Sequence, residues 1–345
     1  MKDYYEVTIG IPLYKSFNYI VESMKTALEQ TFPDIEYLIV DDCGNDGSLD
    51  IVLNLQKTHS RGKDIRIIKN DRNRGVSFCR NYIIQHSKGK YLYYMDSDDL
   101  IEPNTIQLLY DYATVNKAQV VYGSYDILDQ INNRPIQKYQ KTSKVIDGDG
   151  LLALYAFKNN RVFQVSVCNC LIDMSFLIQS GLRFISVSYW EDMAFTTELV
   201  SKVSKAVVLS DITYHYIWHE GSLSHNCQGN SINNNNVMNS FSVLEYLKMK
   251  SIELKDKPFM PYLCYNLEIN AFYVVCYILK NYHILDSTIS IFDMRDILRH
   301  PLCVVDILKF DHEKYSNLFF WLIGVLPILF FLPTIRIMGK FKNSI

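Results

Sequence analysis

The sequence predicts an α/β fold in which a mostly parallel sheet is flanked by helices and followed by a C-terminal helical addition. Three observations predict it. Short apolar runs alternate with segments of helical spacing through residues 7–122, which is typical of βαβ units. Two of these runs end in carboxylates, at 41–42 and 96–99, and open α/β sheets bind ligands beyond the carboxyl ends of their strands. Past residue 236 only helical spacing continues.

The parallel sheet is expected in the first third of the chain. Its strands are predicted at 7–11, 37–40, 65–68, 91–95 and 120–122, with helices at 17–30, 48–55, 77–86 and 103–116. Ser48 is expected to cap the second of these helices. The connections between parallel strands should be right-handed crossovers.

The pattern changes after residue 126. Asn132-Asn133 and Pro135 predict a hairpin. Beyond it we expect a helix at 147–158, a strand at 165–171, a short helix at 175–180 that Gly181 ends, a helix from Tyr189 to about residue 202, and a strand at 206–209. The Asn-rich stretch 230–236 predicts a linker, and helices are expected at 237–252, 260–281 and 291–300.

The composition argues against some classes of function. The chain has 345 residues, a formal net charge of −2 and 21% charged residues, and this balance argues against a nucleic-acid-binding protein. None of the 8 cysteines forms a CxxC pair, and no secretory signal peptide is recognisable at the start. These features predict reduced, buried thiols in a cytoplasmic protein.

The acidic stretch 96–99 is the strongest candidate site. Asp96, Asp98 and Asp99 follow the apolar run 91–95 directly. Like charges this close repel one another unless a cation lies among them, and carboxylates suit Mg²⁺ or Mn²⁺ with substrate phosphates completing the coordination. The stretch therefore predicts a divalent-metal site for a phosphorylated donor. The alternative is a solvated loop in which Asp98 or Asp99 caps the next helix, near Pro103.

The stretch 318–332 is apolar and uncharged, and Arg336, Lys340 and Lys342 follow it. As a helix it would reach ~22 Å, less than the ~30 Å of a bilayer's hydrocarbon core, and Pro327 interrupts it. A short apolar segment with a basic flank predicts a position in the membrane interface. The alternatives are a buried packing helix and a dimer contact.

Several ordered motifs resemble those of the family 2 glycosyltransferases with the GT-A fold, a Rossmann-like α/β fold. The resemblance covers roughly residues 7–224. The motifs are Ile11-Pro12-Leu13-Tyr14, Gln30-Thr31-Phe32, Val40-Asp41-Asp42, Asp46-Gly47-Ser48, Asn73-Arg74-Gly75-Val76, Arg80-Asn81, Asp96-Ser97-Asp98-Asp99 (a DXD-type motif) and Glu191-Asp192. Members of the family transfer a sugar from a nucleotide diphosphate to a hydroxyl group, usually with inversion at the anomeric carbon.

The resemblance implies how the nucleotide is held. Pro12 and Tyr14 would lie against the base, since a tyrosine ring offers a flat apolar face with a polar tip. Asp42 would accept a hydrogen bond from uracil if the donor is a uridine nucleotide. Arg80 would lie near the base or the phosphates; the alternative is an ordinary ion pair with Asp41 or Asp42.

The resemblance also implies a metal site and a catalytic base. Asp96 would contact the ribose or the metal, Ser97 would belong to the nucleotide site, and Asp98 would ligate Mn²⁺ or Mg²⁺, which offsets charge on the leaving diphosphate. His219, rather than His215, would reach the metal or the diphosphate.

Asp192 would be the general base that takes the proton of the acceptor hydroxyl, with Glu191 as the second choice. A single displacement needs one base, unlike glycoside hydrolysis with its carboxylate pair. The chain departs from the family pattern at Cys43, where Gly or Ser is usual, and at Lys15, where Asn is common.

The resulting hypothesis is an inverting, metal-dependent hexosyl- or N-acetylhexosaminyl-transferase. It would use a nucleotide diphosphate sugar, with uridine favoured, and a glycan or lipid-linked acceptor in bacterial capsule, exopolysaccharide or lipopolysaccharide synthesis. It would lie on the inner face of the cell membrane. One alternative is a nucleotidyltransferase, although residues 11–16 lack the glycine-rich phosphate loop expected there. The other is a non-catalytic scaffold, although Asp96, Asp98 and Asp192 are all present.

The predicted domain boundaries follow from these patterns. The catalytic domain is expected at 1–228, with a nucleotide-sugar half at about 1–125 and an acceptor half at about 126–228. The helical addition is expected at 229–312 and the apolar, basic tail at 313–345.

Overall fold

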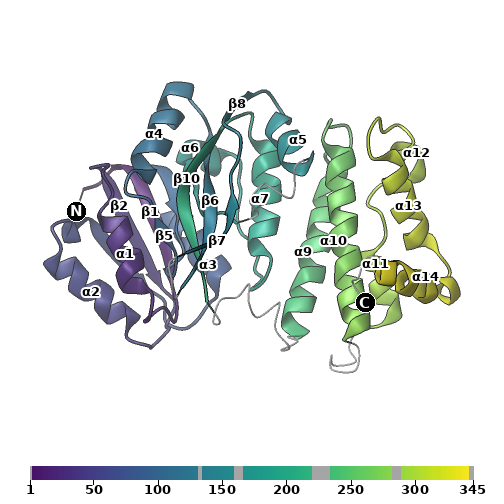
Figure 1. The fold of residues 1–345 in the computed structure, drawn as a ribbon, viewed down its shortest axis with the longest axis horizontal. Coiled ribbons are helices and arrows are strands. Elements are labelled where there is room, and N and C mark those ends of the chain that lie inside the picture. The colour runs from purple at the N-terminus through teal and green to yellow at the C-terminus, as the bar shows by residue number, and fades with distance from the viewer. Residues whose placement is uncertain (1, 131–133, 159–165, 220–233, 282–288, 342–345) are drawn as a thin grey trace.

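The computed structural model describes residues 2–130, 134–158, 166–219, 234–281 and 289–341. Within them a central sheet is surrounded by helices, and a second group of helices stacks beyond α7 (Figure 1). The α/β fold class with a C-terminal helical region is therefore confirmed.

One half of the sheet is wholly parallel. It contains β1 (Tyr5–Leu13), β2 (Ile35–Asp41), β3 (Ile65–Lys69) and β4 (Gly89–Tyr94) in the order β3-β2-β1-β4. All seven residues of β2 are buried, as expected of a parallel strand covered on both faces. Helix α3 packs so closely on β1 that a Cβ atom at Gly10 would lie 2.5 Å from the side chain of Ile83. The strands predicted here are all present.

The other half of the sheet is mixed. Strand β9 (Cys170–Asp173) runs antiparallel to both β4 and β6 (Val120–Asp129), and β10 (Lys205–Trp218) runs parallel to β6. The short β5 (Leu100–Ile101), β7 (Pro135–Tyr139) and β8 (Lys144–Asp147) pair antiparallel with β10, β6 and β10 respectively. The β6–β7 pairing confirms the predicted hairpin, whose turn at 131–133 lies outside the described residues.

The helices around the sheet are α1 (Ile20–Leu28), α2 (Ser48–Thr58), α3 (Val76–His86), α4 (Thr105–Asn116), α5 (Leu151–Lys158), α6 (Met174–Gln179) and α7 (Glu191–Lys202), with a 3-10 turn at Gly62–Asp64. Two local predictions are wrong. Ser48 does not cap α2: it is the first helical residue, and its N–H and hydroxyl both donate to Asp46. Neither Asp98 nor Asp99 caps α4, because β5 intervenes and Asn104 occupies the N-cap.

Other boundaries shift. The first helix starts at Ile20 rather than 17, the strand predicted at 165–171 is the shorter β9, and the strand predicted at 206–209 is the 14-residue β10. The seven described cysteines are all free, as predicted, but Cys303 is exposed and Cys43 is half-buried, so the prediction that all are buried is wrong for these two. Cys227 and residues 230–233 of the linker predicted at 230–236 lie outside the described residues, and the prediction is wrong for 234–236, which begin a helix at Asn234.

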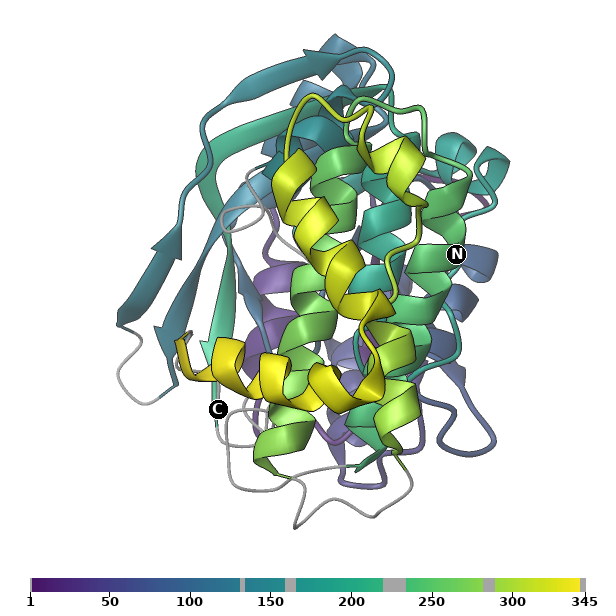
Figure 2. The ribbon, with the colours of Figure 1, turned by 90° about the vertical axis from the view of Figure 1, so that its right-hand side faces the viewer.

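The C-terminal region contains α9 (Asn234–Ile252), α10 (Met260–Lys280), α11 (Ile291–Ile297), α12 (Val304–Ile307), α13 (Lys314–Val325) and α14 (Ile328–Phe341). Figure 2 shows these helices standing together beside the sheet. A buried ion pair joins Lys248 of α9 to Glu268 of α10 at 2.6 Å, and the same ammonium donates to the carbonyls of Ile297 and Arg299. This cation therefore holds α9, α10 and the end of α11 together.

The stretch predicted as one apolar segment at 318–332 is divided between two helices, α13 and α14, which meet at Leu326 and Pro327. Both pack on the helices before them, α13 on α10 and α12 and α14 on α10 and α11. Among the described residues one helix, α10, is long and apolar enough to cross a membrane, and 61% of its apolar window is buried in the protein.

Candidate active site

The candidate residues gather at the carboxyl edge of the parallel strands. The pairing of β1 with β2 and with β4 brings the segments after Leu13, Asp41 and Tyr94 side by side. The N–H of Asp42 donates to the carbonyl of Leu13, and the N–H of Met95 donates to the carbonyl of Gly10. The two acidic segments thus share one edge, as expected from their positions after parallel strands.

Arg80 on α3 is the centre of the site. Its guanidinium is almost completely buried, with Nη1 lying 2.9 Å from Glu191 Oε1 and 2.6 Å from Asp192 Oδ1. Its Nη2 lies 3.0 Å from Asp96 Oδ1. The alternative prediction for Arg80, an ion pair with Asp41 or Asp42, is therefore wrong. Instead, one cation joins the acidic loop after β4 to the first turn of α7, because the planar fork can bind several carboxylates at once.

The environment of Asp192 perturbs its ionisation. Burial raises the pKa of the Asp192 carboxyl to about 7, and the neighbouring charges of Glu191 and Asp96 act in the same direction. Arg80 opposes this shift. A carboxyl group with a pKa near neutrality is suited to act as a general base at physiological pH.

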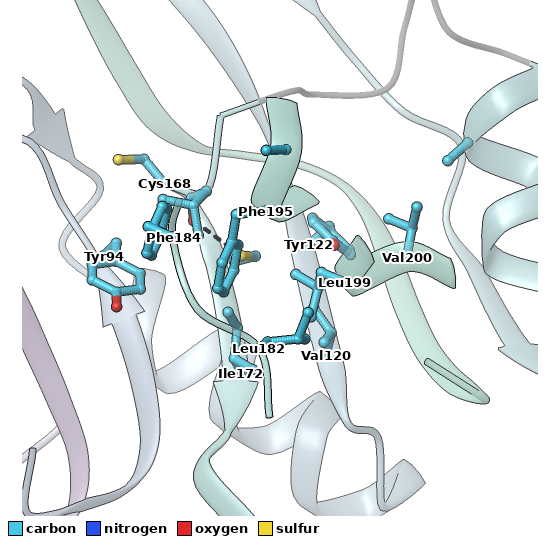
Figure 3. Close-up of a cluster of buried hydrophobic side chains, with 14 of the residues drawn as sticks. Tyr94, Val120, Tyr122, Cys168, Ile172, Leu182, Phe184, Phe195, Leu199 and Val200 are labelled. Carbon is cyan, nitrogen blue, oxygen red and sulfur yellow. Dashed lines mark hydrogen bonds between the residues drawn. The ribbon is translucent and has the colours of Figure 1, made fainter. Parts of the chain in front are cut away.

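The helix that carries Glu191 and Asp192 is held firmly against the sheet. Figure 3 shows Phe195 and Leu199 of α7 facing side chains of the sheet and of the segment before α7. The rings of Phe184 and Phe195 stack at a centroid distance of 4.1 Å, and Tyr94 of β4 meets Phe184 edge-on. The Arg80 guanidinium lies over the ring of the same Phe184, 5.5 Å from the ring centroid. Aromatic packing therefore fixes the distance between α7 and α3.

The acidic loop after β4 is clamped by the end of β10. Asp99 is buried: its Oδ2 accepts from the Tyr214 hydroxyl at 2.6 Å and its Oδ1 from the Ile217 N–H at 2.9 Å. Burial, with the charges of Asp98 and Asp96, raises the pKa of Asp99 well above its usual range. Asp99 thus points toward β10 and anchors the loop.

Asp98 points the other way. Its carboxylate is 31% exposed and lies 3.0 Å from Nε2 of the buried His219. The ring of Tyr19 stacks on His219 at 4.2 Å, and the Nδ1 atom of His219 has no hydrogen-bond partner among the described residues. His215 points elsewhere, with its ring nitrogens 2.6 Å from Asp126 and 3.0 Å from Glu102.

These groups fit a metal that arrives with its substrate. A carboxylate and an imidazole are ligands that Mn²⁺ accepts, and oxygen ligands from a diphosphate would complete its coordination. Asp99 is held by Tyr214, so the side chains that could hold a cation are Asp98, His219 and the partly exposed carboxylate of Asp96, of which Arg80 contacts one oxygen. In the part of the chain that the structure describes, no three His, Cys, Asp or Glu side chains form a metal cluster by themselves.

Two of the residues predicted to hold the nucleotide, Pro12 and Tyr14, lie at the end of β1 and directly after it. Pro12 pairs with Val40 inside the sheet, whereas the ring of Tyr14 is 43% exposed. The hydroxyl groups of Ser97 and Ser16 hydrogen-bond one another, which joins the loop after β1 to the acidic loop.

Asp42 is buried beside this loop. Its carboxylate accepts from the backbone N–H groups of Arg74 and Gly75, both at 2.8 Å, and from the Asn70 side chain at 2.7 Å. Asp42 therefore fixes the backbone of the turn that precedes α3.

Sequence reasoning missed several of these partners. Tyr19, Asn70 and Tyr214 hold functional candidates in place, and none of them is among the site residues predicted from the sequence. The pairing of Arg80 with Glu191 and Asp192 spans more than 100 positions. The one signal available for Tyr214 was its place in an aromatic stretch that ends at His219.

Comparison with known proteins identifies a family and several similar sequences. A family model described as "Glycosyl transferase family 2" matches residues 8–182. The cholesterol galactosyltransferase of Borreliella burgdorferi is 26% identical over 64% of this chain and 62% of its own length. The chain therefore matches less than two thirds of that protein. The UDP-Glc:alpha-D-GlcNAc-diphosphoundecaprenol beta-1,3-glucosyltransferase WfaP of Escherichia coli is 26% identical over 69% of this chain and 87% of its own length.

The similarity extends to three dimensions. The crystal structure of Staphylococcus aureus TarS 1–349 in complex with UDP-GlcNAc superposes with a TM-score of 0.63. It covers 92% of this chain and 90% of that chain, at 15% sequence identity. At this identity the likeness shows a shared fold, which includes the C-terminal helices, and confirms the GT-A-like class.

Proposed function

Because the chain belongs to glycosyltransferase family 2, we propose that it transfers a sugar from a nucleotide diphosphate to an acceptor hydroxyl, with inversion at the anomeric carbon. The observation that carries this proposal is the buried guanidinium of Arg80, which joins the acidic loop to Asp192. This contact supports a donor and a proton acceptor in one site, as a single displacement requires. Family membership speaks against a nucleotidyltransferase.

In the proposed reaction Asp192 removes the proton of the acceptor hydroxyl. The hydroxyl oxygen forms a bond to the anomeric carbon as the bond from that carbon to the diphosphate oxygen breaks, and the diphosphate leaves with the electron pair. Asp192 is 19% exposed at its side chain, so substrate can reach it. Arg80 fixes one of its oxygens, and Glu191, held by the same guanidinium, is a positioning partner.

Asp98 and His219 would hold Mn²⁺ or Mg²⁺ in this proposal. When bound, the cation would neutralise charge on the diphosphate, which is Lewis-acid catalysis. The contribution of the chain is to present an exposed carboxylate and a ring fixed by Tyr19, while Asp99 and Tyr214 keep the loop in place. Asp96 and Ser97 would contact the ribose or the diphosphate from the same loop.

We propose that the donor is a uridine nucleotide. The names of WfaP and of the TarS complex refer to UDP-linked sugars, which supports this choice. Tyr14 would stack on the base and Asp42 would lie near its polar edge. The acceptor is proposed to be a glycan or a lipid-linked glycan of a bacterial surface polysaccharide, reached at the inner face of the cell membrane. The domain division at 228 and 312 stays a prediction.

The test is a transfer assay with purified full-length protein, Mn²⁺ and a panel of uridine, guanosine and thymidine diphosphate sugars. The expected result is metal-dependent release of a nucleoside diphosphate from a uridine donor, abolished by EDTA. Release of pyrophosphate, or no turnover of any donor with and without metal, would count against the proposal. A thermal-shift series supports the assay, because ~100-fold excess of ligand over Kd should add about 2.7 kcal/mol of stability.

A further inference from the structure

Helix α13 is apolar on the face that points away from the protein. Phe320, Ile323 and Gly324 are buried on its inner face. The outer face carries side chains that repeat every three or four positions, namely Tyr315 (85% exposed), Phe319 (46%), Leu322 (54%) and Val325 (54%). A surface helix normally turns polar residues outward, so the apolar outer face of α13 indicates that something covers it. Its inner face holds the one buried polar residue of the helix, Asn317.

Helix α14 continues this surface. Leu329 is 78%, Phe330 58% and Ile337 57% exposed. A shallow groove runs along the helix, lined by Ile328, Leu329, Leu332, Pro333, Arg336 and Ile337. We call the exposed residues Tyr315, Phe319, Leu322, Val325, Leu329, Phe330 and Ile337, together with Arg336, the α13–α14 surface. Arg336 is the single charged residue of the groove, so this surface is apolar with a basic component.

Charge favours one occupant for this surface. Residues 314–345 contain four Lys or Arg, at 314, 336, 340 and 342, and no Asp or Glu. A second copy of the chain would bring two basic surfaces together, and neither α13 nor α14 carries a carboxylate that could pair them. A bilayer of anionic lipids offers both partners that this surface needs. Its acyl chains would contact Leu329 and Phe330, and its headgroup phosphates would contact Arg336.

The shape of the surface favours contact along a bilayer rather than insertion across it. The 14 residues of α14 would reach ~21 Å, less than the ~30 Å of the hydrocarbon core. Both views place α14 across the lower half of the helical region, the half toward which β10 runs (Figures 1 and 2). The carboxyl edge of the sheet, where the candidate site lies, therefore faces the same end of the molecule as α14.

We propose that the α13–α14 surface docks on anionic phospholipid and thereby holds the active site at a membrane-anchored acceptor. This inference rests on the proposed function for the identity of the acceptor, but the lipid contact can be tested without any reaction.

The experiment is co-sedimentation of the full-length protein with vesicles of phosphatidylglycerol and phosphatidylcholine mixed one to one, and with vesicles of phosphatidylcholine alone. Wild type is expected to sediment with the anionic vesicles, and more weakly as the salt concentration rises. Leu329→Glu should lower the partition coefficient at least about tenfold, because it removes a large apolar side chain from the contact. Arg336→Gln should lower it about fivefold and flatten the salt dependence.

Val115→Glu is the matched control, because Val115 is 82% exposed on α4, in the sheet domain. It should bind vesicles as wild type does. Equal binding of Leu329→Glu and wild type, or no binding by wild type, would overturn the proposal. A concentration-dependent dimer in light scattering that Leu329→Glu dissociates would assign the surface to a second copy and also overturn it.

Transfer to a soluble acceptor separates this proposal from the proposed function. Leu329→Glu should keep the wild-type rate in solution. Failure of vesicle binding with transfer intact would contradict only the lipid contact, whereas failure of transfer with binding intact would contradict only the reaction.

Discussion

Nη1 of Arg80 lies 2.6 Å from Oδ1 of Asp192, although 112 positions separate the two residues. The same side chain reaches Asp96, so α3 connects the loop after β4 to the start of α7. A buried cation among three carboxylates satisfies charges that would otherwise repel one another. The arrangement makes the orientation of the proposed base, on α7, depend on a residue of another helix, α3.

Replacing Arg80 should damage both stability and turnover. Arg80→Met leaves Asp96, Glu191 and Asp192 without their shared cation, and breaking a buried pair typically costs about 3–5 kcal/mol. We expect a lower free energy of unfolding in urea and a fall in kcat of about 100-fold. Arg80→Lys keeps the charge but loses the fork geometry, so it should recover stability more than kcat. Full kcat in Arg80→Lys would contradict the positioning role.

Turnover should depend on the protonation of Asp192. Its pKa is raised to about 7, and a general base acts only when deprotonated. The value of kcat/KM should therefore be maximal above pH 7 and fall about tenfold per pH unit below it. Donor affinity measured over the same pH range is the control, since it should change far less. A kcat/KM that stays constant between pH 5.5 and 8 would argue against Asp192 as the base.

Tyr214→Phe should loosen the acidic loop. The hydroxyl of Tyr214 donates to buried Asp99, and leaving that carboxyl oxygen unpaired costs about 1–3 kcal/mol. We expect a lower Tm and a weaker apparent affinity for Mn²⁺, because Asp98 is carried by the same loop. Tyr112→Phe, on the exposed face of α4, is the control and should change neither quantity. An unchanged metal affinity in Tyr214→Phe would show that Asp99 does not position Asp98.

Lys141→Met should stabilise the protein. Lys141 is buried without a carboxylate partner among the described residues, and its Nζ donates to the carbonyl of Gly123 at 2.7 Å. Burial lowers the pKa of Lys141 from 10.5 to about 8. The folded state therefore binds this proton less tightly than the unfolded state, so the charged amine opposes folding fully below pH 8.

We expect Lys141→Met to raise the free energy of unfolding by about 1–3 kcal/mol at pH 7. This advantage should shrink as pH rises from about 8 toward 10.5, because wild type then folds with a neutral amine and loses the penalty. Urea denaturation at pH 7 and pH 9.5 measures both effects. A destabilised Lys141→Met at both pH values would mean that the bond to Gly123 outweighs the cost of the buried charge.

The parallel half of the sheet could be predicted because its strands are buried on both faces and therefore read as continuous apolar runs, as at Tyr37-Leu38-Ile39-Val40. The position of Asp42 and Asp96 at one edge followed from that pattern. The antiparallel insertion of β9 between β4 and β6 could not be predicted, since its four residues carry no register information.

Contacts between residues far apart in the sequence could not be predicted either. Asp99 resembles a metal ligand in sequence, and only the pairing of β5 with β10 turns it toward Tyr214. Pro327 signalled a break in the apolar stretch, but the packing of α13 on α10 depends on the tertiary fold. Local patterns identified the residue types of the site, and the topology decided which of them meet.

The most direct test compares wild type with Asp192→Asn in donor binding and in sugar transfer, with Mn²⁺ present and with Glu191→Gln as the matched neighbour. We expect Asp192→Asn to bind the uridine diphosphate sugar with a Kd within about twofold of wild type. Transfer should fall at least about 100-fold, and Glu191→Gln should lose less. Transfer by Asp192→Asn at the wild-type rate would show that Asp192 is not the general base.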